Sequence, residues 1–211
     1  MKYMLKNMKN SPFKGINYSY VTSDYGKRKF WNQFTNRFDS NFHNGIDLIS
    51  GDEIVSIMDG EVVACRNSIE GYTEKYSLGN YVTLKHDGNI KTIYAHMKKG
   101  SIMVNKGDYV SKGSILGVKG STGYSVSPHL HFAVKVNNKY VDPKPYLTAD
   151  SEVKYVVKKG DNLSKIAKKY NTTWKSIYSK NKGIIGSNPN LIKPGMVLYI
   201  WKIWISFLEL F

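Results

Sequence analysis

The stretch His129-Leu130-His131-Phe132-Ala133-Val134-Lys135-Val136 alternates apolar side chains with polar or small ones, as a half-buried β-strand does. Residues at i and i+2 of a strand point to the same face, so His129 and His131 can both face one metal ion. One of them can bind the ion while the other transfers protons. The stretch therefore predicts a sheet in which a single strand carries both a ligand and a catalyst.

Two further histidine clusters favour a metal site, His43-Asn44-Gly45-Ile46-Asp47 and Tyr94-Ala95-His96. A straight strand would hold His43 and Asp47 roughly 13 Å apart, too far to share one ion, and Gly45 supplies the bend between them. An imidazole, a carboxylate and a second imidazole make three protein ligands. This is the pattern of a catalytic zinc site whose fourth position is open for water.

The remaining histidine and the only cysteine have no such setting. His86 follows Val82-Thr83-Leu84-Lys85 and has no partner at metal spacing, so we interpret it as a structural or surface histidine. Cys65 lies in an unrelated strand-like stretch and cannot complete a closed structural zinc site. A single cysteine also excludes an intrachain disulfide.

Five further motifs surround the histidine clusters: Thr22-Ser23-Asp24-Tyr25-Gly26-Lys27-Arg28, Asp59-Gly60-Glu61-Val62, Gly107-Asp108-Tyr109-Val110-Ser111-Lys112-Gly113, Gly120-Ser121-Thr122-Gly123 and Val141-Asp142-Pro143. With them the chain resembles the lysostaphin and LytM group of zinc metallopeptidases, which cut peptide cross-links of bacterial peptidoglycan. The resemblance covers nearly all of residues 17–148. It implies a mostly β fold built on an antiparallel sheet like the duplicated hybrid motif, with one Zn²⁺ in the catalytic domain. It also implies that His43, Asp47 and His131 hold the zinc and that His96 and His129 are the catalytic pair.

Some residues depart from the pattern of the group. Ser127 stands where the group usually has Gly before the Pro-His-Leu-His run. Residues 32–41 and 68–77 lengthen two segments, so we expect the rim of the cleft to be particular to this protein. Members that cut glycyl bonds tend to carry a Tyr shortly before the first His, whereas residues 31–42 contain Phe34, Phe38 and Phe42 but no Tyr. This argues against a pentaglycine substrate.

The pattern changes after a polar stretch, residues 149–152, which we interpret as a linker. A strand is expected at residues 153–157, then a helix with Asp161 as N-cap, a second helix that begins after Thr172 or Thr173, and a last strand at residues 196–200. This βααβ order, with the runs 155–163 and 188–195, resembles the LysM module, which binds the N-acetylglucosamine-containing backbone of peptidoglycan or chitin. The resemblance implies glycan contacts from two loops: Gly160, Asp161, Asn162 and Leu163 in the first, and Asn188, Pro189, Asn190 and Leu191 in the second.

The domain organisation predicted for the 211 residues is therefore an N-terminal arm (1–16), a zinc endopeptidase domain (17–148), a linker (149–152), a LysM module (153–200) and an apolar tail (201–211). The net charge of +15 attracts polyanions. Nucleic acid is excluded, because the lysines are spread over both modules without a nucleic-acid motif. Anionic wall polymers and the carboxylates of peptidoglycan fit the charge.

The two ends of the chain raise questions of export and membrane contact. The first ten residues are basic and lack the apolar run of a signal peptide, although the expected substrate lies outside the membrane. Passage through holin-type lesions, delivery by a virion, or a truncated gene start would each resolve this. The tail at 201–211 is apolar but shorter than the roughly 20 residues of a membrane span. It is left open whether the tail lies on a membrane, packs on the module or is a read-through artefact.

The sequence thus predicts a bacteriolytic, phage endolysin-like peptidoglycan hydrolase with a zinc endopeptidase domain and a LysM wall anchor. The alternatives are a non-catalytic wall-binding or activator protein and a structural protein of a virion or spore coat. An activator that had lost its ligands would carry substitutions at His43, Asp47 or His131, and none is present. Which cross-link is cut, and which of His96 and His129 is the general base, stay open at this point.

Overall fold

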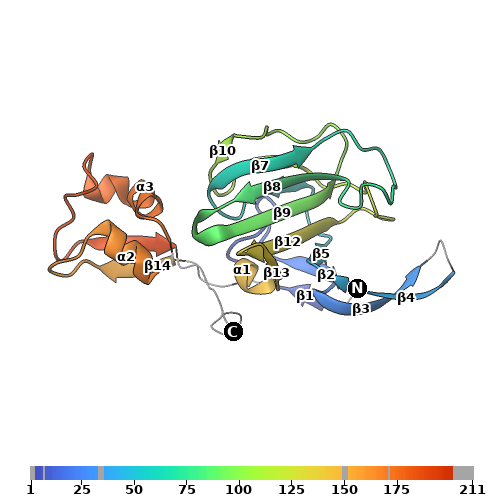
Figure 1. Ribbon diagram of the computed structural model, residues 1–211, viewed down its shortest axis with the longest axis horizontal. Helices are drawn as coiled ribbons and strands as arrows, with labels where there is room; N and C mark the ends of the chain where they lie inside the picture. Colours follow the sequence, from blue (N-terminus) through green and yellow to red (C-terminus); the bar gives the residue numbers. More distant parts are fainter. Residues whose placement is uncertain (1–2, 7, 33–35, 149–151, 171, 202–211) are drawn as a thin grey trace. The chain divides into compact units, whose positions relative to one another are not determined.

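The computed structural model describes residues 3–6, 8–32, 36–148, 152–170 and 172–201 (Figure 1). The chain divides into two compact units, residues 1–148 and 149–211. Parts of the linker and tail predicted from the sequence, residues 149–151 and 202–211, lie outside the described residues. No helix of the described part is both long and apolar enough to cross a membrane.

A nine-stranded antiparallel sheet forms the first unit, in the order β1-β2-β5-β12-β9-β8-β7-β10 with β13 paired to β12 (Figure 1). Its strands are β1 (Tyr3–Leu5), β2 (Ser19–Ser23), β5 (Ile46–Leu48), β7 (Gly60–Arg66), β8 (Asn80–Lys85), β9 (Ile90–Met97), β10 (Tyr109–Val110), β12 (Leu130–Val136) and β13 (Lys139–Val141). A 3-10 turn, η1 (Asp87–Asn89), precedes β9, and a short helix, α1 (Lys144–Thr148), ends the unit. The mostly β, antiparallel fold predicted from the sequence is confirmed.

Two small sheets complete the first unit. In one, β6 (Glu53–Val55) pairs with β11 (Ile115–Val118). In the other, β3 (Gly26–Asn32) pairs with β4 (Arg37–His43) in a hairpin that reaches out past the main sheet (Figure 1). The extra residues noted in the sequence before the first predicted ligand therefore build this hairpin.

The hydrophobic core of the first unit packs against the central strands β9 and β12. Leu130, Phe132 and Val134 of β12 are fully buried, as the alternation of this strand predicts. Tyr94 of β9 packs against Phe132 at a ring separation of 5.3 Å, and its hydroxyl accepts a hydrogen bond from the backbone N–H of Ile57. The opposite face is also covered, because Ile93, Ala95 and Ala133 form a second buried cluster. The strand that carries the predicted ligand and catalyst is therefore held rigidly from both sides.

The N-terminal segment is not the separate arm that we expected from the sequence. Strand β1 pairs with β2 at the edge of the main sheet, and Phe13 and Met8 are buried in the unit. The backbone N–H of Val55 donates to the carbonyl of Pro12. Burial of these apolar side chains stabilises the segment against the domain, and its described residues form part of the first unit.

The second unit has the predicted βααβ order: β14 (Glu152–Val156), α2 (Leu163–Lys169), α3 (Trp174–Ile185) and β15 (Val197–Trp201). The module was predicted at residues 153–200, and its first and last strands each extend one residue beyond these bounds, to Glu152 and Trp201. Thr173 caps α3 as expected, but α2 is capped by Asn162 rather than Asp161. Asp161 instead accepts hydrogen bonds from the hydroxyl of Tyr155 and the backbone N–H of Lys158, at 2.7 and 2.8 Å.

This small unit has its own core, in which the two helices pack on the strand pair. The buried members are Tyr155, Val157, Leu163, Ile166, Ala167, Ile177, Ile185, Leu198 and Ile200. Asn181 is buried in α3 and exchanges hydrogen bonds with the backbone of Tyr199 in β15. These bonds satisfy a polar group that would be costly to bury alone.

Candidate metal and catalytic site

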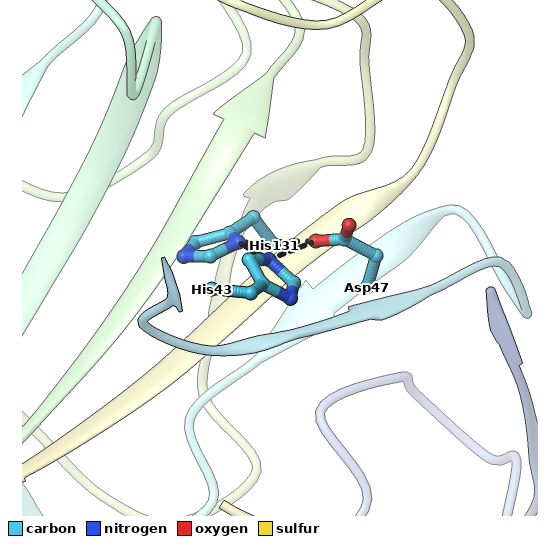
Figure 2. A group of neighbouring side chains, drawn as sticks. All are labelled: His43, Asp47 and His131. Atoms are coloured by element: carbon cyan, nitrogen blue, oxygen red, sulfur yellow. Dashed lines mark hydrogen bonds and ion pairs between the residues drawn. The ribbon is translucent and has the colours of Figure 1, made fainter. Parts of the chain in front are cut away.

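The three side chains predicted as metal ligands converge from the ends of different strands. His43 is the last residue of β4, Asp47 lies in β5, and His131 faces Asp47 in the ladder of β12 with β5. His131 Nδ1 is 3.0 Å from Asp47 Oδ1 and 3.0 Å from His43 Nε2 (Figure 2). His43 Nε2 lies 3.2 Å from Asp47 Oδ1. All three residues are buried, and one ligand atom of each lies within 4.8 Å of the others.

The donor set fits a zinc ion. Nδ1 of His43 donates to the carbonyl of Asp24 at 2.8 Å, which leaves Nε2 with a free lone pair toward the site. Burial lowers the pKa of His131, so its imidazole is neutral at physiological pH. Burial alone would raise the pKa of Asp47, but its hydrogen bonds with His131 and His43 outweigh this and hold it well below its usual range. Two neutral imidazoles and one ionised carboxylate are what zinc binds.

Gly45 does more than bend the chain between His43 and Asp47. A Cβ at this position would lie 2.6 Å from the carbonyl of Phe132 and 2.7 Å from Cε1 of His131. Any side chain would therefore displace the ring of His131. The close approach of the two segments explains why glycine stands between the ligands.

His96 and His129 lie side by side next to the ligand cluster, with ring centroids 4.7 Å apart. His96 is the last residue but one of β9 and has a left-handed backbone conformation at φ 61°. Its Nδ1 donates to the carbonyl of Thr122 at 2.7 Å. His129 Nδ1 donates to the carbonyl of Ser127 at 2.8 Å, and its Nε2 lies 3.7 Å from Asp47 Oδ1. Both rings therefore carry the free lone pair on Nε2.

The two histidines differ in their surroundings. Burial, followed by the neighbouring His129 and His131, lowers the pKa of His96 to about 3. His129 is half-buried and has a direct neighbour in the carboxylate of Asp47. A low pKa makes His96 a poor proton acceptor.

A cleft of about 510 Å³ opens over these five residues. Its walls are largely aromatic: Phe30, Trp31, Phe42, Tyr124 and Tyr140. Phe30, Trp31 and Phe42 come from the β3–β4 hairpin, and Ser77 comes from the lengthened segment between β7 and β8. Of the two lengthened segments, residues 68–77 supply Ser77 to the cleft, whereas residues 32–41 are flanked by the lining residues Trp31 and Phe42.

Several supporting residues were not assigned from the sequence. Arg28 Nη1 lies 3.4 Å from Asp47 Oδ2, and the carbonyls of Asp24 and Thr122 hold His43 and His96. These residues lie inside the motifs around residues 22–28 and 120–123. The motifs could have pointed to them, but the contacts are made by backbone carbonyls or across a hairpin, which spacing alone does not reveal.

His86 lies away from the cluster and has a structural setting. It is buried, with Nδ1 donating to the carbonyl of Asp59 at 2.7 Å and Nε2 2.7 Å from the hydroxyl of Thr92. Burial lowers its pKa to about 4. It is therefore a core histidine, and the surface alternative is wrong.

In the second unit, the segments that flank the two loops expected to contact glycan are joined by a hydrogen bond from the N–H of Gly195 to the carbonyl of Val157 at 2.9 Å. Gly160, Asn162, Asn188, Asn190 and Leu191 are exposed, whereas Asp161 and Pro189 are half-buried. Leu163 is 4% exposed and belongs to the core of the second unit. Its side chain is therefore buried and does not line the surface of the first loop.

Comparison with known proteins defines the class. Residues 41–143 match peptidase family M23, and residues 155–201 match the LysM domain. The solved catalytic domain of the antimicrobial peptidase lysostaphin from Staphylococcus simulans is 30% identical, with a TM-score of 0.50, and is covered over 93% of its length by 62% of this chain. The chain therefore belongs to peptidase family M23 and carries a LysM domain after the peptidase domain.

Two curated relatives show the range of named activities. The chain is 38% identical over 102 residues to the peptidoglycan DD-endopeptidase ShyB of Vibrio cholerae, which covers 47% of this chain and 22% of ShyB. It is 35% identical over 141 residues to the glycyl-glycine endopeptidase ALE-1 of Staphylococcus capitis, which covers 64% of this chain and 37% of ALE-1. The chain thus spans well under half the length of these relatives.

Proposed function

We propose that this protein is a zinc-dependent endopeptidase that cleaves peptide cross-links of peptidoglycan and is held on the cell wall by its LysM domain. The observation that carries the proposal is the convergence of His43, Asp47 and His131 beside His96 and His129. Membership of peptidase family M23 and the names of the relatives support it. Wall peptide and glycan are the proposed partners, which lie outside the cell membrane.

His43, Asp47 and His131 would hold the metal. When bound, zinc lowers the pKa of a water molecule from about 15.7 toward 7 and polarises the scissile carbonyl. The rest of the chemistry belongs to the protein. Asp47 is occupied as a ligand, so proton transfer falls to the two remaining histidines.

We assign proton transfer to His129. Its Nε2 lone pair faces the cleft, and the nearby Asp47 carboxylate at 3.7 Å stabilises the imidazolium that forms when it accepts a proton from the attacking water. The same nitrogen then delivers the proton to the leaving amine. His96, whose pKa is lowered by burial, accepts the hydrogen bond that orients the water. The carbonyls of Ser127 and Thr122 keep both rings in the required tautomer.

The walls of the cleft favour a cross-link with side chains larger than glycine. Phe30, Trp31 and Phe42 offer apolar surface that a pentaglycine bridge cannot cover. We therefore propose a D-alanyl to diamino acid bond as the preferred substrate, in keeping with the DD-endopeptidase name of ShyB, over the glycyl-glycine bond named for ALE-1.

Mass spectrometry of fragments released from purified walls tests the proposal. Walls with direct cross-links and walls with pentaglycine bridges are digested in parallel, with His131→Ala protein as the inactive control. We expect new amino termini at the diamino acid of the direct cross-link. Release of glycyl termini would reverse the substrate assignment. No new termini from either wall would favour the activator or the structural alternative.

A further inference from the structure

We propose that Arg28 is a positioning residue of the metal site, which holds Asp47 so that one carboxylate oxygen, Oδ1, is presented to the ion. This inference rests on the zinc site of the proposed function. It assigns a role to a side chain that acts on the metal site through its contact with Asp47.

The two oxygens of Asp47 have different neighbours. Oδ1 faces the ligand nitrogens, at 3.2 Å from His43 Nε2 and 3.0 Å from His131 Nδ1. Oδ2 faces away from them and lies 3.4 Å from Nη1 of Arg28. A carboxylate can bind a metal through one oxygen or both. A zinc site with three protein ligands and an open fourth position needs a single oxygen here.

Arg28 is itself fixed by partners from three strands. Its Nη1 donates to the hydroxyl of Ser23 at 2.6 Å, and its Nε donates to Asn41 Oδ1 at 2.9 Å. The guanidinium lies 5.2 Å from the ring centroid of Phe30. The planar guanidinium holds several N–H groups in fixed directions and can bind these partners at once. The single ammonium of lysine cannot.

The same network reaches a second ligand. The hydroxyl of Ser23, which accepts the bond from Arg28, lies 3.3 Å from Nδ1 of His43. Arg28 and Asp47 are also shielded from water, with side chains 22% and 11% exposed. An ion pair in such surroundings is screened less than one at the surface, so it can orient the carboxylate. Loss of a partner that orients a ligand typically weakens metal binding by about 10- to 100-fold.

Arg28→Gln and Arg28→Lys in the full chain test this role. Arg37 provides the matched control, because it lies in the facing strand β4 and pairs with Asp39 while its side chain is 71% exposed. Zinc affinity is measured by competition with a chelator, and the cobalt-substituted proteins are compared by visible absorption. Cobalt absorbs strongly in a four-coordinate site and weakly in a site of higher coordination number, so the spectrum reports whether Asp47 binds through one oxygen.

We expect Arg28→Gln to bind zinc about 10- to 100-fold more weakly and to show weakened cobalt absorption. Arg28→Lys should fall between it and the wild type, and Arg37→Gln should match the wild type. Wild-type affinity and an unchanged spectrum in Arg28→Gln would overturn the inference. If wild-type protein binds no zinc, the proposed function fails instead.

A second variant covers the case in which Arg28→Gln does not fold. Asn41→Ala removes the acceptor that fixes Nε of Arg28 while every charge at the site is kept, and Asn41 is exposed. We expect zinc affinity to fall several-fold and cobalt absorption to weaken in this variant. An unchanged affinity and spectrum would then overturn the role of Arg28.

Discussion

His131 lies directly opposite Asp47 in the antiparallel ladder of β12 with β5, and its Nδ1 approaches Asp47 Oδ1 to 3.0 Å. His129 precedes β12 by one residue, and its Nε2 lies 3.7 Å from the same oxygen. A shift of register by two residues would keep both side chains on the same face of the sheet and would place His129 opposite Asp47. The strand register therefore decides which histidine of the pair serves as ligand and which faces the substrate cleft.

The carbonyl of Thr122 that holds His96 depends on Gly79. A Cβ at Gly79 would lie 2.3 Å from that carbonyl oxygen, so Gly79→Ala must displace it, and His96 with it. We expect kcat to fall by up to about 100-fold, the cost of misplacing a catalytic group by about 1 Å, with zinc content unchanged. Measurement of kcat on a soluble cross-linked peptide, beside zinc analysis, tests this.

Gly71 is the matched control for this prediction. It has the same φ of 59° as Gly79, but a Cβ there would meet no atom within 4 Å. Gly71→Ala should therefore cost about 1–2 kcal/mol of folding stability from its left-handed backbone and leave kcat unchanged. Equal kcat losses in both variants would mean that strain in the loop, and not the contact with Thr122, disturbs His96.

His86 should make folding stability depend on pH. Its pKa is lowered to about 4 in the folded state by burial, so between roughly pH 6.5 and 4 the unfolded chain binds a proton that the folded chain does not. The contribution of His86 to the free energy of unfolding is therefore fully present above this pH window and falls by roughly 3 kcal/mol as the pH drops through it. Denaturant unfolding of wild type and His86→Gln at pH 7 and pH 4.5 measures the difference.

We expect His86→Gln to be less stable than the wild type at pH 7, because it loses a buried ring with two hydrogen bonds. Its free energy of unfolding should, however, fall less than that of the wild type between pH 7 and pH 4.5. Its zinc content should equal that of the wild type. The same loss of stability on acidification in both proteins would show that His86 does not carry the effect.

The LysM domain should increase activity on intact walls without affecting the chemistry. The second unit has its own core, and a tethered glycan-binding module raises the local concentration of the enzyme at its substrate. A chain ending at Thr148 should cleave soluble muropeptides as fast as the full chain and degrade intact walls more slowly. The rates on the two substrates are to be compared in parallel.

Leu191→Asp in the full chain tests the same role of the LysM domain with a single substitution, because Leu191 is 57% exposed in the second loop expected to contact glycan. It should reduce sedimentation with purified peptidoglycan and leave muropeptide cleavage unchanged. If neither truncation nor this variant slows wall degradation, the LysM domain does not serve as the anchor.

Local patterns in the sequence were sufficient for much of the fold. The alternation in β12 predicted a strand with His129 and His131 on one face, and Thr173, which caps α3, was one of the two starts expected for that helix. Long-range pairing was not predictable in the same way. Phe13 lies among polar residues with no periodicity, and it is buried only because the chain returns to it through Ile54.

Where two residues were equally suitable for one role, the structure was needed to choose between them. Asp161 and Asn162 are both good caps, and the hydroxyl of Tyr155 decides between them by engaging Asp161. The role of Arg28 depends on Asn41, which only the β3–β4 hairpin brings next to it. Spacing indicated the side chains that we propose to carry the chemistry, whereas the residues that orient them follow from tertiary contacts.

Metal analysis of two neighbouring variants tests the central claim most directly. His131→Ala removes a ligand from the cluster of His43, Asp47 and His131, whereas His129→Ala removes a proton-transfer group. We predict that His131→Ala purifies with little zinc, while His129→Ala keeps one zinc per chain and loses about 100- to 10,000-fold in turnover. Zinc retained in His131→Ala and lost from His129→Ala would contradict the assignment of the site.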